Sequence, residues 1–429
     1  MQEQTEGNEK SVYDLIVIGG GPAGMMAAGR AAERGKTVLL LEKNESLGKK
    51  LLISAQGRCN VTNSAPMHVF LEAYGKAGNF LRTALTAFDN ESLRRFLADR
   101  GVATVEERKG RVFPESQRAD TILNALISYM NEHGVTINSG VNAVRLKLSD
   151  REIAGVETNP PIPPLTKGGK GDLYCRNCLI ATGGLSYPST GSTGDGYRMA
   201  SEMGHTITPT YPSIVAFETA ERWVTSLQGF PLKNVKIKAF QKSVCIAEQF
   251  GEALFTHYGI SGPTILDMSK KIVESLPSGP VTLRIDLKPY STQEELDNTI
   301  LYHLKKHGGK QIKNALDGFL SPRLAPTLLK ICEIDEFEKA SQVGKSERKK
   351  LAKLLKDLRL ILIRHRPIEE AMVTAGGVNL DEIDPKTMQS KIFKGLYFAG
   401  EILDVDGPTG GFNLQAAFST GYLVGESIC

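Results

Sequence analysis

A chain of 429 residues exceeds what one hydrophobic core usually organises, so the sequence predicts two or three domains. Its six cysteines are too few and too scattered for a secreted disulfide framework, and its net charge of +4 is unevenly distributed. The first residues lack the basic start of a signal peptide, and no apolar run approaches the ~20 residues of a membrane-spanning helix. We therefore expect a cytoplasmic protein without a membrane segment.

A glycine-rich loop follows the first apolar run. Residues Asp14–Ile18 are typical of a strand, and GGGPAG at 19–24 leads into an alanine-rich helix. In this setting Gly19 permits a tight turn, Gly21 lets a pyrophosphate approach the backbone, and Gly24 allows close packing of helix on strand. The helix N-terminus attracts phosphates. The predicted contacts to a dinucleotide are Gly19, Gly21, Pro22, Ala23 and Gly24.

An acidic residue ends the second predicted strand. Residues Thr37–Leu41 are followed by Glu42, 18 residues after Gly24. A carboxylate at this place accepts hydrogen bonds from both ribose hydroxyls of an adenosine and disfavours a 2′-phosphate. We expect Glu42, with Lys43 beside it, at the adenosine end of the cofactor.

A hairpin is predicted in the middle of the first half. Its strands are Ile153–Glu157 and Tyr174–Ile180, and its proline-rich tip, residues 158–172, is expected to be exposed and poorly ordered. The second strand runs into the turn LIATGG at 179–184, which suits a chain crossing back beside a dinucleotide. Thr182 and Gly183 are therefore predicted cofactor contacts.

The same strand contains a C-x-x-C pair, Cys175 and Cys178. Residues three apart on a strand point to opposite faces, and no second cysteine or histidine pair completes a metal site. We interpret the pair as structural and predict no metal.

Two kinds of pattern fill the region that follows. Residues 204–291 alternate in strand fashion, as in NVKIKAFQ and VTLRIDLKP, which predicts a small β domain. Residues 292–370 are predicted to be helical, because apolar residues recur at helical spacing. These are Leu351, Leu354, Leu355, Leu358 and Ile361.

One histidine of the β segment lies in a stretch rich in glycine, serine and threonine. His257, in FTHYGISGP, fits either a hydrogen bond that braces the loop or a proton donor that faces a substrate. Tyr258 and Tyr187 are weaker candidates for the same proton donor.

Positive charge is concentrated in the helical segment. Residues 305–366 contain 16 Lys and Arg against 7 Asp and Glu. Such a surface is either solvated or binds phosphates, and clustering on one helix face is typical of nucleic-acid contact. The cations predicted on one helix are Lys345, Arg348, Lys349, Lys350, Lys353, Lys356 and Arg359.

The end of the chain repeats the arrangement of strand, glycine-rich loop and helix. Glu401, after the strand LYFAG, would reach a ribityl chain, and GPTGGFN at 407–413 opens a helix whose N–H groups could face the N1–C2=O edge of a flavin. A nicotinamide enzyme would not need this second loop. We therefore predict one FAD held from both chain ends. The predicted contacts here are Gly376, Gly377, Gly400, Glu401, Gly410, Gly411, Phe412 and Asn413.

Together these elements predict an α/β protein. A Rossmann-like FAD-binding domain is built from both chain ends, residues 12–203 and 371–429. An inserted β domain, 204–291, and an inserted basic helical domain, 292–370, lie between them in the sequence.

The sequence resembles the BaiN/RdsA family of FAD-dependent oxidoreductases. The resemblance rests on residues 48–64, 110–119, 251–269, 374–378 and 395–421, and it spans nearly the whole chain. It implies FAD as cofactor. The activities it implies include bile-acid enone reduction, aminoacetone oxidation and dihydrouridine synthesis in ribosomal RNA.

The resemblance also implies that the loop after Glu42 folds over the isoalloxazine ring. Arg58, Asn60 and Asn63 would then donate hydrogen bonds to flavin or substrate. Cys59 either has a lowered pKa beside Arg58 and acts as an acid or redox-sensitive thiol, or it only packs.

One departure from the family is visible in this loop. The family usually has glycines before GRCN, where this chain has Ala55 and Gln56. If that turn needs a positive φ, either Ala55 is strained or the loop has moved.

The expected chemistry is hydride transfer by the flavin, with NAD(P)H as the expected reductant. No second G-x-G-x-x-G unit is present, so NAD(P)H would reach the flavin without a Rossmann domain of its own. Three functions remain open: reduction of uridine in ribosomal RNA, which we favour; turnover of a small enone or amine; and flavin binding without turnover.

Overall fold

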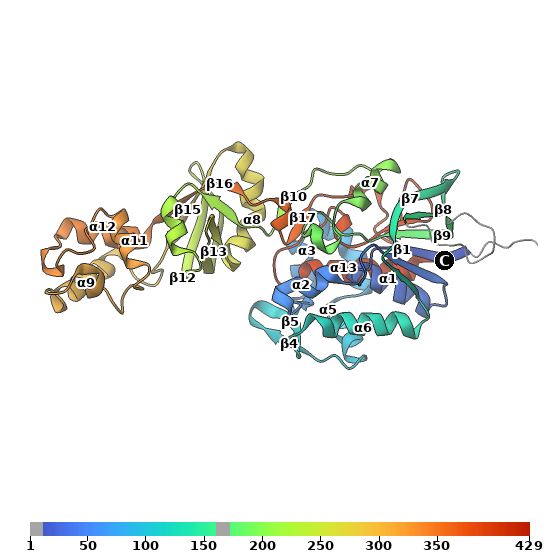
Figure 1. Cartoon of the computed structure of the whole chain (residues 1–429), viewed down its shortest axis with the longest axis horizontal. Helices are drawn as coiled ribbons and strands as arrows, with labels where there is room; N and C mark the ends of the chain where they lie inside the picture. The colour runs from blue at the N-terminus through green and yellow to red at the C-terminus, as the bar shows by residue number, and fades with distance from the viewer. Residues whose placement is uncertain (1–11, 160–171) are drawn as a thin grey trace, which may run out of the picture. The chain divides into compact units, whose positions relative to one another are not determined.

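The computed structural model describes residues 12–159 and 172–429, which form two compact units (Figure 1). The first unit extends to Tyr211 and resumes at Ile368, so it contains both chain ends. The second unit is Pro212–Pro367. Residues 160–171 of the tip predicted to be poorly ordered lie outside the described residues.

The first unit is built on a seven-stranded sheet. Its order is β6 (Thr136–Ser139), β2 (Val38–Glu42), β1 (Val12–Ile18), β9 (Asp172–Ile180), β8 (Glu152–Asn159) and β7 (Asn142–Ser149), with β18 (Leu396–Phe398) also paired to β9. Strands β6, β2, β1, β9 and β18 run parallel to one another. Strand β8 pairs antiparallel with β7 and β9, as expected of the predicted hairpin.

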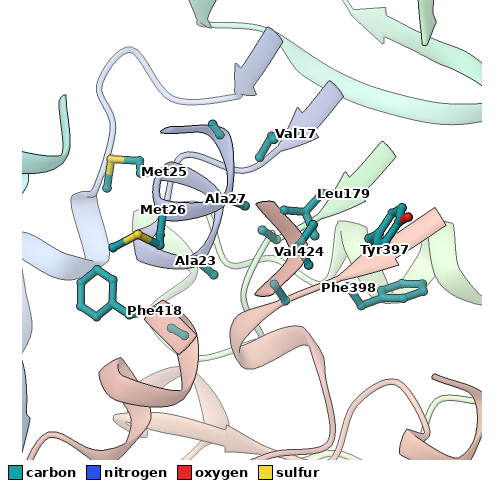
Figure 2. Close-up of a cluster of buried hydrophobic side chains, with 14 of the residues drawn as sticks. Val17, Ala23, Met25, Met26, Ala27, Leu179, Tyr397, Phe398, Phe418 and Val424 are labelled. Carbon is teal, nitrogen blue, oxygen red and sulfur yellow. The ribbon is translucent and has the colours of Figure 1, made fainter. Parts of the chain in front are cut away.

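The two chain ends meet where α1 (Pro22–Glu33) packs against α13 (Phe412–Ser427). A Cβ atom at Gly421 would lie 2.2 Å from the carbonyl oxygen of Ala23, so only glycine allows this approach. Figure 2 shows side chains of both helices together with Leu179 and Phe398 in one buried cluster. Burial of this cluster favours a single domain made from the two ends.

The remaining elements of the first unit lie in the sequence between β2 and β18. It consists of α2 (Lys49–Ile53), β3 (Thr62–Asn63), α3 (Met67–Ala73), α4 (Gly78–Ala87), α5 (Asn90–Ala98), β4 (Thr104–Glu107), β5 (Arg111–Pro114), α6 (Ala119–Glu132), α7 (Asp195–Glu202) and β17 (Val373–Ala375). Strands β3, β5 and β4 form a small separate sheet. Strand β10 (Tyr211–Ser213) spans the boundary of the two units.

The second unit contains a closed barrel and a group of helices. The barrel strands are β11 (Phe217–Thr219), β14 (Gly259–Ser261), β13 (Val244–Phe255), β12 (Pro231–Gln241), β15 (Val281–Asp286) and β16 (Leu358–His365), and α8 (Pro263–Ser275) packs against β13. The helices α9 (Gln293–Lys306), α10 (Ile312–Ala315), α11 (Ala325–Ile331) and α12 (Lys345–Lys356) lie in sequence between β15 and β16. A division into separate domains at residue 291 stays a prediction.

Strand β16 corrects the predicted helix in this segment. Helix α12 ends at Lys356, and Asp357 has a non-helical φ of −147°. The leucines of β16 are buried and the residues between them are exposed, which is the two-residue period of a barrel strand. The helical prediction for Leu358 and Ile361 is wrong, because β11 and β15 pair with this run.

None of the helices in residues 12–159 and 172–429 combines the length and apolar character needed to cross a membrane. The cytoplasmic location stays a prediction.

A buried histidine links the segment after α7 to the segment before β18. His205 Nδ1 lies 3.0 Å from Glu382 Oε2, and its Nε2 lies 2.9 Å from Ser390 Oγ. The ring is completely buried, and this burial holds the pKa of His205 below its usual value despite the opposing effect of Glu382. The folded protein therefore favours the neutral ring.

We predict that His205 makes stability depend on pH. Because the folded pKa is below the unfolded value of about 6.5, the contribution is complete above pH 6.5 and is lost as pH falls toward the folded pKa. His205→Gln should lower the free energy of unfolding by about 1–3 kcal/mol at pH 7.5 and by less at pH 5.5. Urea unfolding at pH 7.5 and at pH 5.5 measures the loss in the free energy of unfolding, and His68→Gln, at an exposed histidine, is the control. Equal losses at the two pH values would contradict the prediction.

Candidate functional site

The predicted cofactor residues gather at the carboxyl ends of the parallel strands. Gly19 follows β1, Glu42 ends β2, Thr182 follows β9 by two residues, and Gly400 follows β18 by two residues. These strands are neighbours in the order β2, β1, β9 and β18, so their carboxyl ends form one edge. Dinucleotides bind at this edge in open α/β sheets.

The first loop fits a pyrophosphate. Gly19 has a φ of 107°, and a Cβ atom there would lie 2.5 Å from the carbonyl oxygen of Ala181. A Cβ atom at Gly24 would lie 2.0 Å from the carbonyl oxygen of Gly19, so helix and strand approach as closely as glycine permits. A Cβ atom at Gly21, the N-cap of α1, would meet no atom within 4 Å. The space that a phosphate would need is therefore open beside Gly21.

Glu42 shapes the turn that would hold the adenosine. Its Oε2 accepts the N–H of Gly20 at 2.8 Å, and its Oε1 accepts the N–H and the side-chain amide of Asn44 at 2.8 and 2.7 Å. Carboxylate oxygens have further lone pairs, so two ribose hydroxyls could still donate to it. Lys43, predicted beside the adenosine, is bound to another residue, since its ammonium donates to Asp195 at 2.6 Å.

A buried hydroxyl at this edge has no partner among the described residues. It belongs to Thr182, whose Oγ1 neither donates nor accepts a hydrogen bond there. Leaving a buried hydroxyl unpaired is costly, but this atom is closed off from solvent and faces α7, where a Cβ atom at Gly196 would lie 2.1 Å from it, so it does not mark an open ligand site. Gly183 beside it has a φ of 74°.

Glu401 is held by three residues that the sequence analysis did not single out. Its Oε1 accepts from Ser186 Oγ at 3.0 Å and from the N–H of Thr374 at 2.9 Å. Its Oε2 accepts from the ammonium of Lys50 at 2.6 Å. Only Lys50 had a signal in the sequence, as part of the GKKLL stretch. The ribityl contact of Glu401 stays a prediction.

The segment between β18 and α13 contacts the start of α1 at Gly400. Gly400 has a φ of 77°, and a Cβ atom there would lie 2.9 Å from Cβ of Ala23. Gly410 and Gly411 have φ values of 114° and 97°, and Gly411 is the N-cap of α13. Gly400 therefore lies against the start of α1, while the start of α13 lies against Thr62, where a Cβ atom at Gly411 would come within 2.2 Å of the carbonyl oxygen.

The side chains around the start of α13 brace the loop. Asn413 accepts the N–H of Gly407 at 2.8 Å and donates to its carbonyl at 2.8 Å. The ring of Phe412 packs on Phe70 at 4.9 Å, and the Tyr74 hydroxyl donates to the carbonyl of Phe412 at 2.7 Å. Cofactor contact by Phe412 and Asn413 stays a prediction.

The glycine pair before the last strand permits close passage of the backbone. Gly376 has a φ of 82°, and a Cβ atom there would lie 2.3 Å from the carbonyl oxygen of Pro209. A Cβ atom at Gly377 would lie 2.5 Å from the carbonyl oxygen of Ile402. The pair thus positions the segment after Gly400, and direct cofactor contact stays a prediction.

The segment after Glu42 reaches the second loop. Asn63 Nδ2 donates to the carbonyl of Gly410 at 2.9 Å. The side-chain amide of Asn60 donates to the main-chain oxygens of Thr62 and Val112, and donation by Asn60 to a flavin stays a prediction. Arg58 donates to Gln117 at 2.6 Å, and its role toward a ligand stays a prediction.

Cys59 corrects a second prediction. The thiol is completely buried, and burial raises its pKa to about 12. The interpretation as a thiol of lowered pKa is wrong, since desolvation outweighs any effect of Arg58. Cys175 and Cys178 are also buried free thiols whose pKa is raised by burial, in keeping with a structural role. Within the described ranges, no three His, Cys, Asp or Glu side chains are grouped to hold a metal.

His257 lies in the second unit, on the exposed turn between β13 and β14. The turn is braced by Thr256, whose N–H donates to the carbonyl of Gly259 at 2.8 Å and whose Oγ1 accepts the N–H of Gly259 at 3.0 Å. The ring of His257 contacts Tyr258, with centroids 4.8 Å apart. A role as proton donor stays a prediction.

The basic helix face is smaller than predicted. Arg348 is paired with Asp297 at 2.6 Å, Lys356 with Asp286 at 2.6 Å, and Arg359 lies on β16 and pairs with Asp357 at 2.7 Å. Four of the seven cations are exposed on α12, namely Lys345, Lys349, Lys350 and Lys353. Among the described residues, Lys350 makes the one ion pair of these four, with Glu333 at 3.8 Å, while Lys345 and Lys349 act electrostatically on Asp297.

Comparison with known proteins identifies relatives over nearly the whole chain. The family model described as the HI0933-like protein Rossmann domain matches residues 13–427. The 3-dehydro-bile acid delta(4,6)-reductase of Clostridium scindens is 32% identical over 96% of this chain and 98% of its own length. The ribosomal RNA dihydrouridine synthases of Haemophilus influenzae and Escherichia coli are each 30% identical, over 96% and 97% of this chain and 98% of each relative.

Solved structures share the fold at low identity. The 3-ketosteroid delta1-dehydrogenase of Sterolibacterium denitrificans has a TM-score of 0.54 and 13% identity, with coverage of 97% of this chain and 99% of the other. An open flavocytochrome c3 fumarate reductase has a TM-score of 0.51 and 17% identity, with coverage of 97% and 78%.

The open space beside Gly21 gives a test of the cofactor site. Gly21→Val should leave the melting temperature of the apoprotein nearly unchanged and weaken FAD binding by at least roughly tenfold, about 1.4 kcal/mol. Gly24→Val is the matched control, because its Cβ would collide with Gly19 and lower the melting temperature itself. Flavin fluorescence titration and thermal unfolding measure the two effects. If Gly21→Val bound FAD as tightly as the parent, the phosphates of FAD would not lie beside Gly21.

The turn before GRCN is strained as the departure from the family predicts. Ala55 has a φ of 48° and Gln56 a φ of 59°. Because a left-handed conformation costs a residue with a Cβ about 1–2 kcal/mol, Ala55→Gly should raise the free energy of unfolding by about 1 kcal/mol. Ala98→Gly, at the exposed end of α5, should instead lower it by about 0.5–1 kcal/mol. Urea unfolding measures both effects. An equal loss in the free energy of unfolding for Ala55→Gly and Ala98→Gly would exclude strain at Ala55.

Proposed function

The chain belongs to the HI0933-like Rossmann family of oxidoreductases, and from this we propose that it is an FAD-dependent reductase of an activated carbon–carbon double bond. The observation that supports FAD most is the contact of the segment after β18 with the start of α1, where a Cβ atom at Gly400 would lie 2.9 Å from the Cβ of Ala23. A nicotinamide dinucleotide alone would leave the second loop without a ligand.

The residues present fit FAD in a definite order. Glu42 would accept the ribose hydroxyls, and the N-terminus of α1 beside Gly21 would receive the pyrophosphate. The N–H groups at the start of α13 would face the electronegative edge of the ring system. Hydride transfer is the chemistry that bound FAD supplies, and we propose NAD(P)H as the source of the hydride.

The names of the relatives suggest one class of substrate. A 3-oxo steroid with a 4,6-diene and a uridine both contain a double bond conjugated to a carbonyl group, which polarises the distal carbon toward hydride. We propose that this chain reduces such a bond and that the bond belongs to a uridine of ribosomal RNA. The exposed lysines of α12 favour RNA over a steroid, because a small apolar substrate has no use for them.

Two other functions are alternatives. A small-molecule enone or amine would be turned over without the basic helix. A flavin-bearing binding protein would hold FAD and transfer no hydride.

The activity is tested in two steps. On anaerobic mixing with NADH and then NADPH, the flavin absorbance near its long-wavelength maximum should disappear within seconds for at least one of them. The reduced protein should then convert uridine to dihydrouridine in ribosomal RNA from cells that lack the protein, as measured by nucleoside mass spectrometry. Reduction by NAD(P)H without dihydrouridine, but with turnover of a steroid enone, would favour the small-molecule alternative. Absence of both reactions would leave flavin binding without turnover.

The lysines of α12 are tested by charge reversal. If they contact phosphates, replacing Lys349, Lys350 and Lys353 by Glu should weaken binding to a ribosomal RNA fragment and reduce the slope of log affinity against log salt by about 2–3. The control reverses three exposed cations of the first unit, Lys76, Arg82 and Lys386. Equal effects of both triple variants would indicate only general charge attraction.

A further inference from the structure

Two large aromatic side chains of the helical segment are exposed. Tyr302 on α9 is 57% exposed, and Phe337, between α11 and α12, is 58% exposed. Rings of this size usually bury most of their surface, because burial of apolar area stabilises the fold. Their exposure is therefore unexplained by packing.

Each of these rings has a lysine over it. Lys306 Nζ lies 5.5 Å from the centroid of Tyr302, and Lys313 Nζ lies 3.8 Å from the centroid of Phe337. Lys313 is also paired with Glu336 at 3.1 Å. Each ring is thus held beside a cation while more than half of its surface remains open to solvent, although Phe337 also lies in a stretch with three carboxylates, Asp335, Glu336 and Glu338.

The chain around Tyr302 is strongly basic. Residues 302–316 contain four lysines, two histidines and no acidic residue. Lysines at the end of a helix also stabilise the helix dipole, which accounts for Lys305 and Lys306 but not for the exposed ring.

The two rings belong to neighbouring segments. Ile312 N–H donates to the carbonyl of Glu338 at 2.8 Å, and Ala340 N–H donates to the carbonyl of Lys310 at 2.9 Å. Ser341 N–H donates to the carbonyl of Gly308 at 3.1 Å, directly after α9. The segment with Phe337 therefore runs along the chain that follows Tyr302, and Figure 1 shows α9, the helix of Tyr302, close to α12, against which it packs.

We propose that Tyr302, Phe337 and the lysines 305, 306, 310 and 313 form a surface that binds single-stranded RNA, named here the aromatic–lysine surface. Open rings stack with bases and lysines contact the phosphates between them, which is the composition of single-strand binding surfaces. An acidic peptide would use the lysines but not the rings. The inference rests on the proposed function, because a uridine must be unstacked before its C5–C6 bond can be reduced.

The test uses the full FAD-loaded protein and a fluorescein-labelled oligouridylate, with a duplex RNA of equal length for comparison. Tyr302→Leu and Phe337→Leu keep apolar bulk and remove the ring, so each should weaken oligouridylate binding by about tenfold. Their salt dependence and duplex affinity should remain those of the parent. Tyr302→Phe keeps the ring and should bind like the parent, as should Tyr290→Leu, which removes an 83% exposed ring outside α9–α12.

Parent-like oligouridylate affinity in both leucine variants would overturn the aromatic–lysine surface. An equal loss in Tyr290→Leu would also overturn it, since general apolar exposure would then suffice. Loss of binding to vesicles with anionic lipid, with RNA binding unchanged, would assign the rings to a membrane surface instead.

Dihydrouridine formation separates this inference from the proposed function. If the parent forms dihydrouridine and both leucine variants form as much, the surface is wrong and the function stands. If the leucine variants lose oligouridylate binding but the parent forms no dihydrouridine, the surface stands and uridine reduction is wrong. If the parent neither binds RNA nor forms dihydrouridine, both are wrong.

Discussion

The structure of the first unit depends on the close approach of α1 and α13. Gly421 allows it by leaving room for the carbonyl of Ala23, and Gly425 leaves room for Arg30, where a Cβ atom would lie 2.6 Å from the Cβ of that residue. Arg30 then donates to Glu426 at 2.7 Å and ties the first helix to the last. This contact places the start of α1 against the second half of α13, so α13 begins ahead of α1 and the loop before it lies beside Thr62. The second unit can therefore be inserted in the sequence between two halves that still form one core.

The site is made more from backbone than from side chains. Glycines line both loops, and the polar side chains beside them, such as Asn413, are mostly engaged in holding the loops in shape. Several donors hold the carboxylates of Glu42 and Glu401 in place. The remaining lone pairs of these oxygens therefore have fixed directions for a ligand. A preorganised site of this kind binds a cofactor without reordering many side chains.

The sequence predicted what is local and could not predict what is distant. The turn at Gly19, the close packing at Gly24 and the strain at Ala55 follow from a few neighbouring residues, and the structure agrees with each. The ion pair of Lys50 with Glu401 joins residues 351 apart, and the pairing of Arg348 with Asp297 removes a cation from the predicted face. Burial of Cys59 depends on the whole fold, so its raised pKa had no local signal. The run LRLILI fits a helix and a strand equally, and only pairing with β11 and β15 decides it.

The central claim is that one FAD is bound by both ends of the chain. Hydrogen exchange followed by mass spectrometry, on the apoprotein and on the protein titrated with FAD, tests it most directly. The account predicts saturation at one FAD per chain, with amide protection appearing together in residues 19–26 and 400–413. Protection confined to residues 19–26, or saturation at two FAD per chain, would contradict it.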